Sequence, residues 1–154
     1  MYGYELTTVP DPILRQECRE VEDYGQLNEL LYSMYDIMSA HGGVGIAAPQ
    51  VGDDRKVMLA QTGGVVREYI NPEIVESRGY QPSIEGCLSM PGRMGFKLRR
   101  YSVTVNYQDR FGEEHEDTYK GFDAVVVQHE IDHLHGRLMT DWGRRKEARG
   151  PDPS

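Results

Sequence analysis

Apolar residues recur at helical spacing between residues 26 and 41. The stripe consists of Leu27, Leu30, Leu31, Met34, Ile37 and Met38. Intervals of three and four residues place such side chains on one face of a helix, and Gly42-Gly43 ends the pattern. The pattern therefore predicts an amphipathic helix from Gln26 to His41 whose leucines and methionines pack into the core rather than hold a cofactor.

Between residues 44 and 108 the pattern changes to short strand-like runs separated by glycine and proline. The predicted strands cover residues 56–60, 68–74, 79–84 and 103–108. A further polar strand over residues 114–119 is predicted to form a hairpin with the strand 103–108, through a turn at residues 109–112.

The last regular element is predicted to be a helix from Phe122 to His135, ended by Gly136. Its apolar residues surround almost the whole helix, so it belongs inside the protein. Three consecutive valines at 125–127 by themselves favour a strand, and the helical assignment depends on the polar motif that follows them. The elements together predict an α+β fold, with short, mostly antiparallel strands around a central buried helix carrying a His-Glu-x-x-His motif.

The length of 154 residues fits one compact domain, and 38% hydrophobic with 27% charged residues is typical of a folded protein. We expect a single domain over residues 1–143. Residues 144–154 are rich in arginine and then in proline and glycine, which predicts a basic, disordered C-terminal tail.

Charge and hydropathy limit the classes of partner. A formal net charge of -8 argues against direct nucleic-acid binding, which needs clustered lysine and arginine. No apolar run approaches the roughly 18 residues that span a bilayer, and the N-terminus lacks a basic stretch followed by an apolar one. We therefore expect a cytoplasmic protein without membrane contact, in which Cys18 and Cys87 form no disulfide. Cys18 lies in a polar stretch without a nearby histidine and is interpreted as an ordinary small side chain.

Residues 128–133 read Gln-His-Glu-Ile-Asp-His and contain the His-Glu-x-x-His pattern. A four-residue step on a helix turns about 400°, so the rings of His129 and His133 lie on one face. Glu130 then flanks a bound metal without ligating it and can exchange protons with water. Because such side chains are costly on a buried helix unless they are satisfied, the pattern predicts two metal ligands and one acid/base group.

Catalytic zinc-type centres generally take three protein ligands, so a third must lie elsewhere. Cys87 is the candidate, because small residues and turn formers on both sides let the backbone bend around a metal. A thiolate with two imidazoles suits zinc, iron(II), cobalt or nickel. The spacing leaves open that Cys87 is instead a covalent nucleophile with a histidine base.

The motif also occurs in metallo-endopeptidases and could belong to a purely structural metal site, but the sequence fits both hypotheses poorly. An endopeptidase with the same motif needs a further ligand downstream, but one such pattern places its third histidine where this chain has Met139. The only glutamate after Glu130 is Glu147, in the basic tail. A purely structural metal site usually closes with four protein ligands and has no use for a flanking glutamate.

Three motifs in this order resemble those of peptide deformylase. They are Gly-x-Gly-x-Ala-Ala-x-Gln at residues 43–50, Glu-Gly-Cys-Leu-Ser at 85–89 and Gln-His-Glu-x-Asp-His at 128–133. The resemblance covers about residues 5–141. It implies a catalytic domain that removes the N-formyl group from N-formylmethionyl peptides of newly made proteins and releases formate.

The resemblance also implies the roles of individual residues. Cys87, His129 and His133 would ligate the metal, Glu130 would be the general acid/base, and Gln50 with the backbone N–H of Leu88 would hold the oxyanion. The implied substrate-binding residues are Val44, Gly45, Gly86, Phe122, Val125 and Val126. Val44 and the three residues of the last helix would surround the methionine side chain, although as plain sequence those three are equally well core residues. The peptide would add along a strand edge near residues 44–46.

The implied cofactor is one divalent metal per chain, iron(II) in the cell, replaceable by nickel, cobalt or zinc. The resemblance also raises association with the ribosome. Because the sequence ends soon after Asp141, we do not expect that contact to be made through a long C-terminal helix.

Overall fold

The computed structural model describes residues 3–141. The predicted boundary at residue 143 and the predicted disordered tail over 144–154 lie outside the described residues. The strands are β1 (Gly45–Ala47), β2 (Val57–Thr62), β3 (Val65–Glu85), β4 (Gly95–Gln108) and β5 (Glu114–Lys120). The helices are α1 (Asn28–Ala40) and α2 (Phe122–Leu134), with short 3-10 helices η1 (Pro12–Arg15), η2 (Tyr24–Gln26) and η3 (Ala48–Val51). Neither α-helix in this range is long and apolar enough to cross a bilayer.

The five strands form one antiparallel sheet in chain order, which agrees with the predicted α+β class. The prediction that the strands are short is wrong for β3 and β4, which have 21 and 14 residues. The two strands predicted at 68–74 and 79–84 are one, because Gly79 has a φ of +65° and the ladder continues through it. Register shifts near Asn71 and Ile74 bend the strand. They interrupt the alternation of apolar residues, while the pairing with β4 continues beyond them.

Both predicted α-helices form within about two residues of their expected ends. In α1 the residues Leu30, Leu31, Met34 and Met38 are buried, as the helical spacing predicts. In α2 every residue from Ala124 to Leu134 is buried, and the three valines are helical because tertiary packing outweighs their β propensity.

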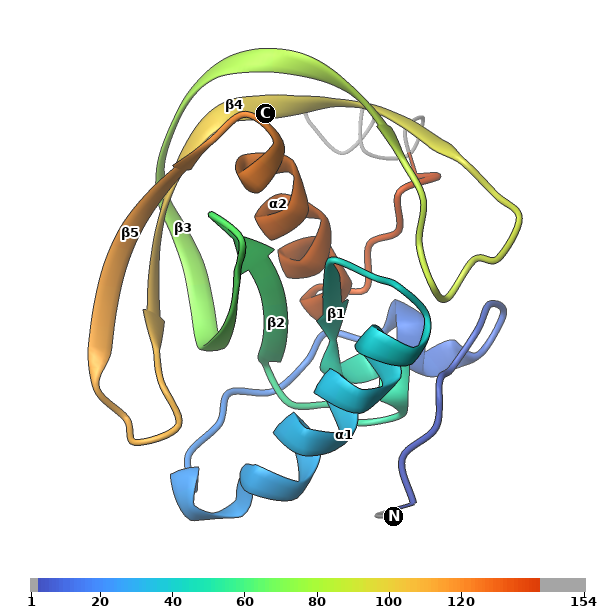
Figure 1. Cartoon of the computed structure of the whole chain (residues 1–154), viewed down its shortest axis with the longest axis vertical. Coiled ribbons are helices and arrows are strands. Elements are labelled where there is room, and N and C mark those ends of the chain that lie inside the picture. Colours follow the sequence, from blue (N-terminus) through green and yellow to red (C-terminus); the bar gives the residue numbers. More distant parts are fainter. Residues whose placement is uncertain (1–2, 142–154) are drawn as a thin grey trace.

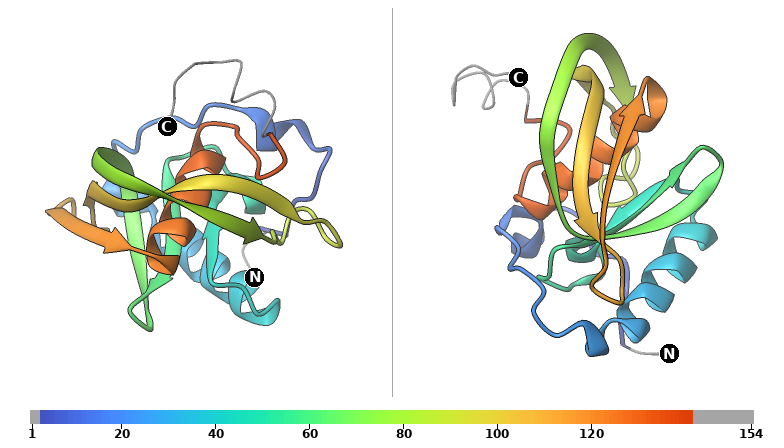
Figure 2. Two further views of the ribbon diagram at one scale, coloured as in Figure 1. Left: turned by 90° about the horizontal axis from the view of Figure 1, so that it is seen from above. Right: turned by 90° about the vertical axis from the view of Figure 1, so that its left-hand side faces the viewer.

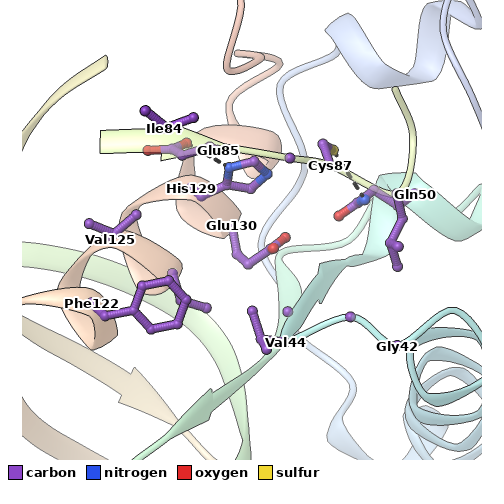
Figure 3. Close-up of a pocket in the computed structure, with 15 residues that line it drawn as sticks. Gly42, Val44, Gln50, Ile84, Glu85, Cys87, Phe122, Val125, His129 and Glu130 are labelled. Carbon is purple, nitrogen blue, oxygen red and sulfur yellow. Dashed lines mark hydrogen bonds and ion pairs between the residues drawn. The ribbon is translucent and has the colours of Figure 1, made fainter. Parts of the chain in front are cut away.

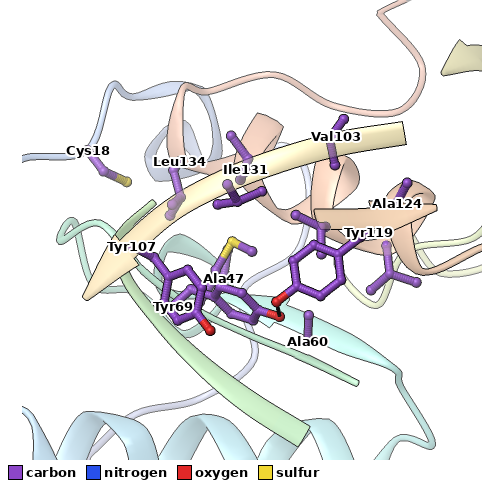
Figure 4. Close-up of a cluster of buried hydrophobic side chains, with 14 residues drawn as sticks. Cys18, Ala47, Ala60, Tyr69, Val103, Tyr107, Tyr119, Ala124, Ile131 and Leu134 are labelled. Atoms are coloured by element: carbon purple, nitrogen blue, oxygen red, sulfur yellow. Dashed lines mark hydrogen bonds between the residues drawn. The ribbon is translucent and has the colours of Figure 1, made fainter. Parts of the chain in front are cut away.

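The long β3–β4 hairpin arches over α2, while β1 and β2 lie on the other side of this helix (Figure 1). Two further views show the same curled hairpin alongside α2, with α1 on the outside of the molecule (Figure 2). A cluster of buried side chains fills the space between α2 and the sheet, and within it the Tyr69 hydroxyl donates to the Tyr119 hydroxyl at 2.9 Å (Figure 4). This packing leaves the helix that carries residues 128–133 enclosed by the sheet.

The N-terminal segment packs against the parts of the chain that carry the candidate site. The Thr7 N–H donates to the Gln50 carbonyl at 2.6 Å, and the Val9 N–H donates to the Ser89 carbonyl at 2.9 Å. Leu14 of η1 is 1% exposed in a cluster that also holds Met90 and Met139. The segment thereby joins η3 to the loop that follows β3.

Candidate metal centre

The two histidines of α2 and the cysteine of the loop after β3 come together. The rings of His129 and His133 have centroids 5.1 Å apart, and Cys87 Sγ lies 3.3 Å from His133 Nε2. One ligand atom of each of the three residues lies within 4.8 Å of the others. Both histidines are buried and Cys87 is half-buried. The helical spacing and the tight loop thus deliver the three predicted ligands to one point.

Glu85, at the end of β3, fixes the orientation of His129. Its Oε1 lies 2.9 Å from His129 Nδ1 (Figure 3). Although burial alone would raise it, hydrogen bonds from Arg99 and His129 hold the pKa of Glu85 far below its usual range, so the group is a carboxylate. A carboxylate that accepts the Nδ1–H is the usual partner of a metal-ligating histidine, and a metal bound at Nε2 would displace the proton from that atom.

The donor set and its surroundings fit a divalent cation. A thiolate with two imidazoles is a ligand set for zinc and similar metals. Within the described part of the chain, Glu130 Oε1 is buried without a hydrogen-bond partner, which is costly unless another polar group serves it. Burial opposes charge on His129, yet its hydrogen bonds to Cys87 and Glu85 raise its pKa to about 10. The space between these groups therefore stabilises positive charge.

Burial is the main cause of the pKa shifts of Glu130 and His133. Burial raises the pKa of Glu130 to about 7, against the opposing effect of His129. Burial also lowers the pKa of His133 to about 3, which keeps its ring in the neutral form that a metal requires. A carboxyl group with a pKa near neutrality can both accept and return a proton under ordinary conditions.

Gln50 lies across the cavity from α2, on η3. Its Oε1 accepts the Ala47 N–H at 2.9 Å, which turns the amide NH₂ toward Ser89 Oγ at 3.2 Å and Cys87 Sγ at 3.7 Å. Leu88 follows Cys87 in the loop and lines the same cavity. The Gln50 amide, which can donate hydrogen bonds, therefore lies beside the Cys87 thiol, and Leu88 belongs to the wall of the same cavity.

These residues surround a cavity of about 370 Å³. Every residue predicted for the site lines this cavity except His133, which contacts Cys87 instead. The predicted substrate-binding residues Val44, Gly45, Gly86, Phe122, Val125 and Val126 are all among the lining residues. The alternative that Phe122 is a core residue is wrong, because its side chain is 66% exposed. Val126 belongs to both the cavity and the core cluster.

Sequence reasoning missed the polar groups that support the ligands. Glu85 lay inside a recognised motif, but no role was assigned to it, and Gln128 was also passed over although its side chain bonds the backbone of Arg100. Lys97 and Arg99 are buried on β4 while Phe96 and Leu98 are exposed, the reverse of an ordinary amphipathic strand. No strand was predicted over residues 95–102, and the apolar residues there do not mark the buried face of β4.

The two cysteines are expected to differ in reactivity. Burial raises the pKa of the Cys18 thiol to about 12, and the side chain lies in the core cluster. Cys87 lines the open cavity.

After metal removal, we expect one thiol per chain to react rapidly with a disulfide reagent at pH 8. The Cys87→Ser variant should have no rapidly reacting thiol. Rapid reaction of Cys18 in the folded protein would contradict the structure, and denatured protein serves as the control for two reactive thiols.

Comparison with known proteins agrees with this geometry. The family model for polypeptide deformylase matches residues 4–149. The peptide deformylase of Carboxydothermus hydrogenoformans is 40% identical over 142 residues, covering 92% of this chain and 93% of that protein. The crystal structure of the Thermotoga maritima peptide deformylase superimposes with a TM-score of 0.87 at 35% identity, covering 90% of this chain and 96% of that one.

A class I type b peptide deformylase from Acinetobacter baumannii, in a crystal structure with Met-Ala-Ser bound, superimposes with a TM-score of 0.82 at 32% identity. The match covers 89% of this chain and 96% of that one. Relatives of this similarity, matched along nearly their whole length, share both fold and family. The chain therefore belongs to the peptide deformylase family of metal-dependent hydrolases, which remove the N-formyl group from newly made peptides.

Proposed function

We propose that this chain hydrolyses the formamide bond of N-formylmethionyl peptides with one divalent metal held by Cys87, His129 and His133. The observation that carries the proposal is the buried set of three donor atoms, which opens on a cavity shared with Glu130 and Gln50. We further propose iron(II) as the metal in the cell, with nickel, cobalt and zinc as replacements, because the ligand set suits all four.

A divalent metal at this position supplies a Lewis acid that polarises the formyl carbonyl and lowers the pKa of water. The chain's own acid/base group is Glu130. Its carboxylate takes a proton from the attacking water and gives it to the amine as the C–N bond breaks, so formate and a free N-terminal methionine are released. The buried position of Glu130 supports this role, because its pKa of about 7 allows both transfers near neutral pH.

Gln50 and Leu88 are proposed to stabilise the negative charge that develops on the formyl oxygen. The Gln50 amide is already oriented by its bond to Ala47, so its NH₂ needs no reorganisation when charge appears. The backbone N–H of Leu88 is proposed as the second donor. Ser89 Oγ, 3.2 Å from the Gln50 amide nitrogen, helps to hold this amide in place.

The apolar side of the cavity is proposed to bind the methionine side chain. Val44, Phe122, Val125 and Val126 line this side, with the backbones of Gly45 and Gly86 nearby. Within the described sheet, β1 pairs with β2 alone, so its other edge is available to an extended peptide. The Met-Ala-Ser complex of the Acinetobacter baumannii relative supports a tripeptide of this kind as the test substrate.

The endopeptidase alternative is not favoured. Family membership speaks against it. Met139 occupies the position of the third histidine in one endopeptidase pattern, and it is 2% exposed and packs against Gly95 in the core.

The family's substrates arise at the ribosome, and we propose action in the cytoplasm. Two free cysteines are consistent with that reducing compartment. We also propose contact with the ribosome itself, which a direct measurement of binding to ribosomes would test.

The decisive experiment measures formate released from formyl-Met-Ala-Ser by protein purified without oxygen, with metal content determined on the same sample. Release should disappear with a chelator and return with iron(II) or nickel. A protein that holds one metal per chain and releases no formate would refute the proposed substrate. A protein without metal would refute the proposed centre.

Gly45 gives a prediction about the placement of Glu130, which is tested by kcat rather than by KM because Gly45 also lines the proposed peptide site. A Cβ at residue 45 would lie 2.6 Å from Glu130 Oε2 and 3.0 Å from its Cδ. We therefore expect Gly45→Ala to displace this carboxylate and to lower kcat by about 100-fold, the effect of misplacing a catalytic group by about 1 Å. Metal content should stay at the wild-type level. Gly25→Ala is the matched control, because its added Cβ meets only Asp23 at 3.4 Å, far from the cavity. Unchanged kcat in Gly45→Ala would contradict the role of Glu130.

A further inference from the structure

A network of buried charges lies behind the cavity and joins three elements of the fold. Arg99 of β4 donates from Nε and Nη2 to the two carboxylate oxygens of Glu85, at 2.7 Å each. Its Nη1 donates to Asp132 Oδ2 at 2.6 Å. Glu85 belongs to β3, and Asp132 belongs to α2 between the two histidines. One guanidinium therefore ties both strands of the long hairpin to the helix of the proposed ligands.

Arg99 touches neither the cavity nor the donor atoms. Its side chain is 4% exposed, and it is absent from the residues that line the cavity. Glu85 is the residue through which it reaches the site, because Glu85 Oε1 accepts from both Arg99 and His129. A carboxylate held on two oxygens by a planar guanidinium has little freedom to rotate. The position of Glu85 Oε1, and hence the direction of the His129 ring, is set by Arg99.

We propose that Arg99 is a positioning residue of the metal centre, which holds Glu85 and Asp132 so that His129 keeps its Nε2 directed at the metal. The inference rests on the proposed metal centre. The fork on Glu85 sets the tautomer and tilt of His129, and the third bond to Asp132 fixes α2 at the residue between the two ligands. Loss of the fork frees the Glu85 carboxylate to turn away from the Nδ1–H.

Arg99→Lys tests the proposal, because lysine keeps the charge but cannot make the two-pronged bond. The dissociation constant for Co(II) is measured by competition with a chelator, on folded protein. We expect it to rise by about 10-fold or more, as when an outer partner of a ligating histidine is lost. We also expect the visible absorption spectrum of the Co(II) protein to change. A purely structural role would lower the unfolding temperatures of metal-free and metal-loaded protein equally and leave the dissociation constant unchanged.

Arg110→Lys is the matched control. Arg110 makes a similar two-pronged bond to Glu68, at 2.7 Å and 3.1 Å, on a part of the chain that does not line the cavity. Its lysine variant should bind Co(II) as the wild type does. Wild-type affinity in Arg99→Lys overturns the inference alone, whereas a wild-type chain that binds no metal overturns the proposed centre with it.

A second comparison decides the matter if Arg99→Lys does not fold. The triple variant Arg99→Met, Glu85→Gln, Asp132→Asn removes the guanidinium together with the two carboxylates that it joins, so neither carboxylate is left buried without the guanidinium. It is compared with Glu85→Gln alone, which keeps the guanidinium. We expect the triple variant to bind Co(II) about 10-fold more weakly than Glu85→Gln. Equal affinities overturn the role of Arg99.

Discussion

Replacing Glu130 with glutamine is expected to lower the rate of formate release by about 100-fold to 10,000-fold, the usual loss when a general acid/base is removed. Glutamine has nearly the same shape but cannot carry the proton from water to the amine. Because Glu130 is not one of the three donors, the variant should bind as much metal as the wild type. The rate and the metal content are measured on the same preparation.

Glu116→Gln on β5 is the matched control, since Glu116 is exposed and lies away from the cavity. Its activity should equal that of the wild type. Stability gives a second readout, because Glu130 Oε1 is buried without a hydrogen-bond partner in the described residues. The metal-free Glu130→Gln protein should unfold at a temperature no lower than the wild type. Undiminished turnover in the variant would remove Glu130 from the mechanism.

Replacing Cys87 with alanine is expected to remove the metal itself. The thiolate is one of three donors, so its loss should weaken metal binding by at least about 100-fold, the upper end of what loss of a mere outer partner costs. Formate release should fall with metal occupancy. The measurement is metal content after dialysis, followed by titration with Co(II).

The same variant separates a ligand from a covalent nucleophile. Cys18→Ala is the control, because Cys18 is the other cysteine of the chain and lies in the core, and it should retain metal and activity. A Cys87→Ala protein that keeps its metal and yet releases no formate would favour a nucleophilic cysteine instead. The 3.3 Å contact between Cys87 Sγ and His133 Nε2 is compatible with both roles, so the metal content decides.

Local sequence patterns predicted the parts of the fold that depend on local spacing. The helical ends of α1 follow from its apolar stripe, and the convergence of His129 and His133 follows from four residues of helix. The continuity of β3 could not be read in the same way. Its middle residues are exposed on both faces, and its register shifts break the alternation, so the strand exists through pairing with β4 rather than through its own pattern.

The support of the site depends on contacts that no local pattern contains. In the β3–β4 ladder Arg99 pairs with Gln81, which lies four residues before Glu85. Asp132 comes from another element, α2. Charged side chains in a strand ordinarily face solvent, which is why Arg99 carried no signal. The hairpin curls over α2 (Figure 1), and the buried Arg99 side chain reaches Asp132 of this helix.

The enclosed position of α2 has a consequence for the order in which the chain can fold. This helix fills the centre of the described structure, yet among residues 3–141 it is the last regular element. During synthesis from the N-terminus, the inner faces of β2 and β3, which present Met58 and Tyr69, emerge before the apolar partner that covers them. The sheet can therefore close its core, and gather Cys87 with the two histidines, only when translation has passed His133.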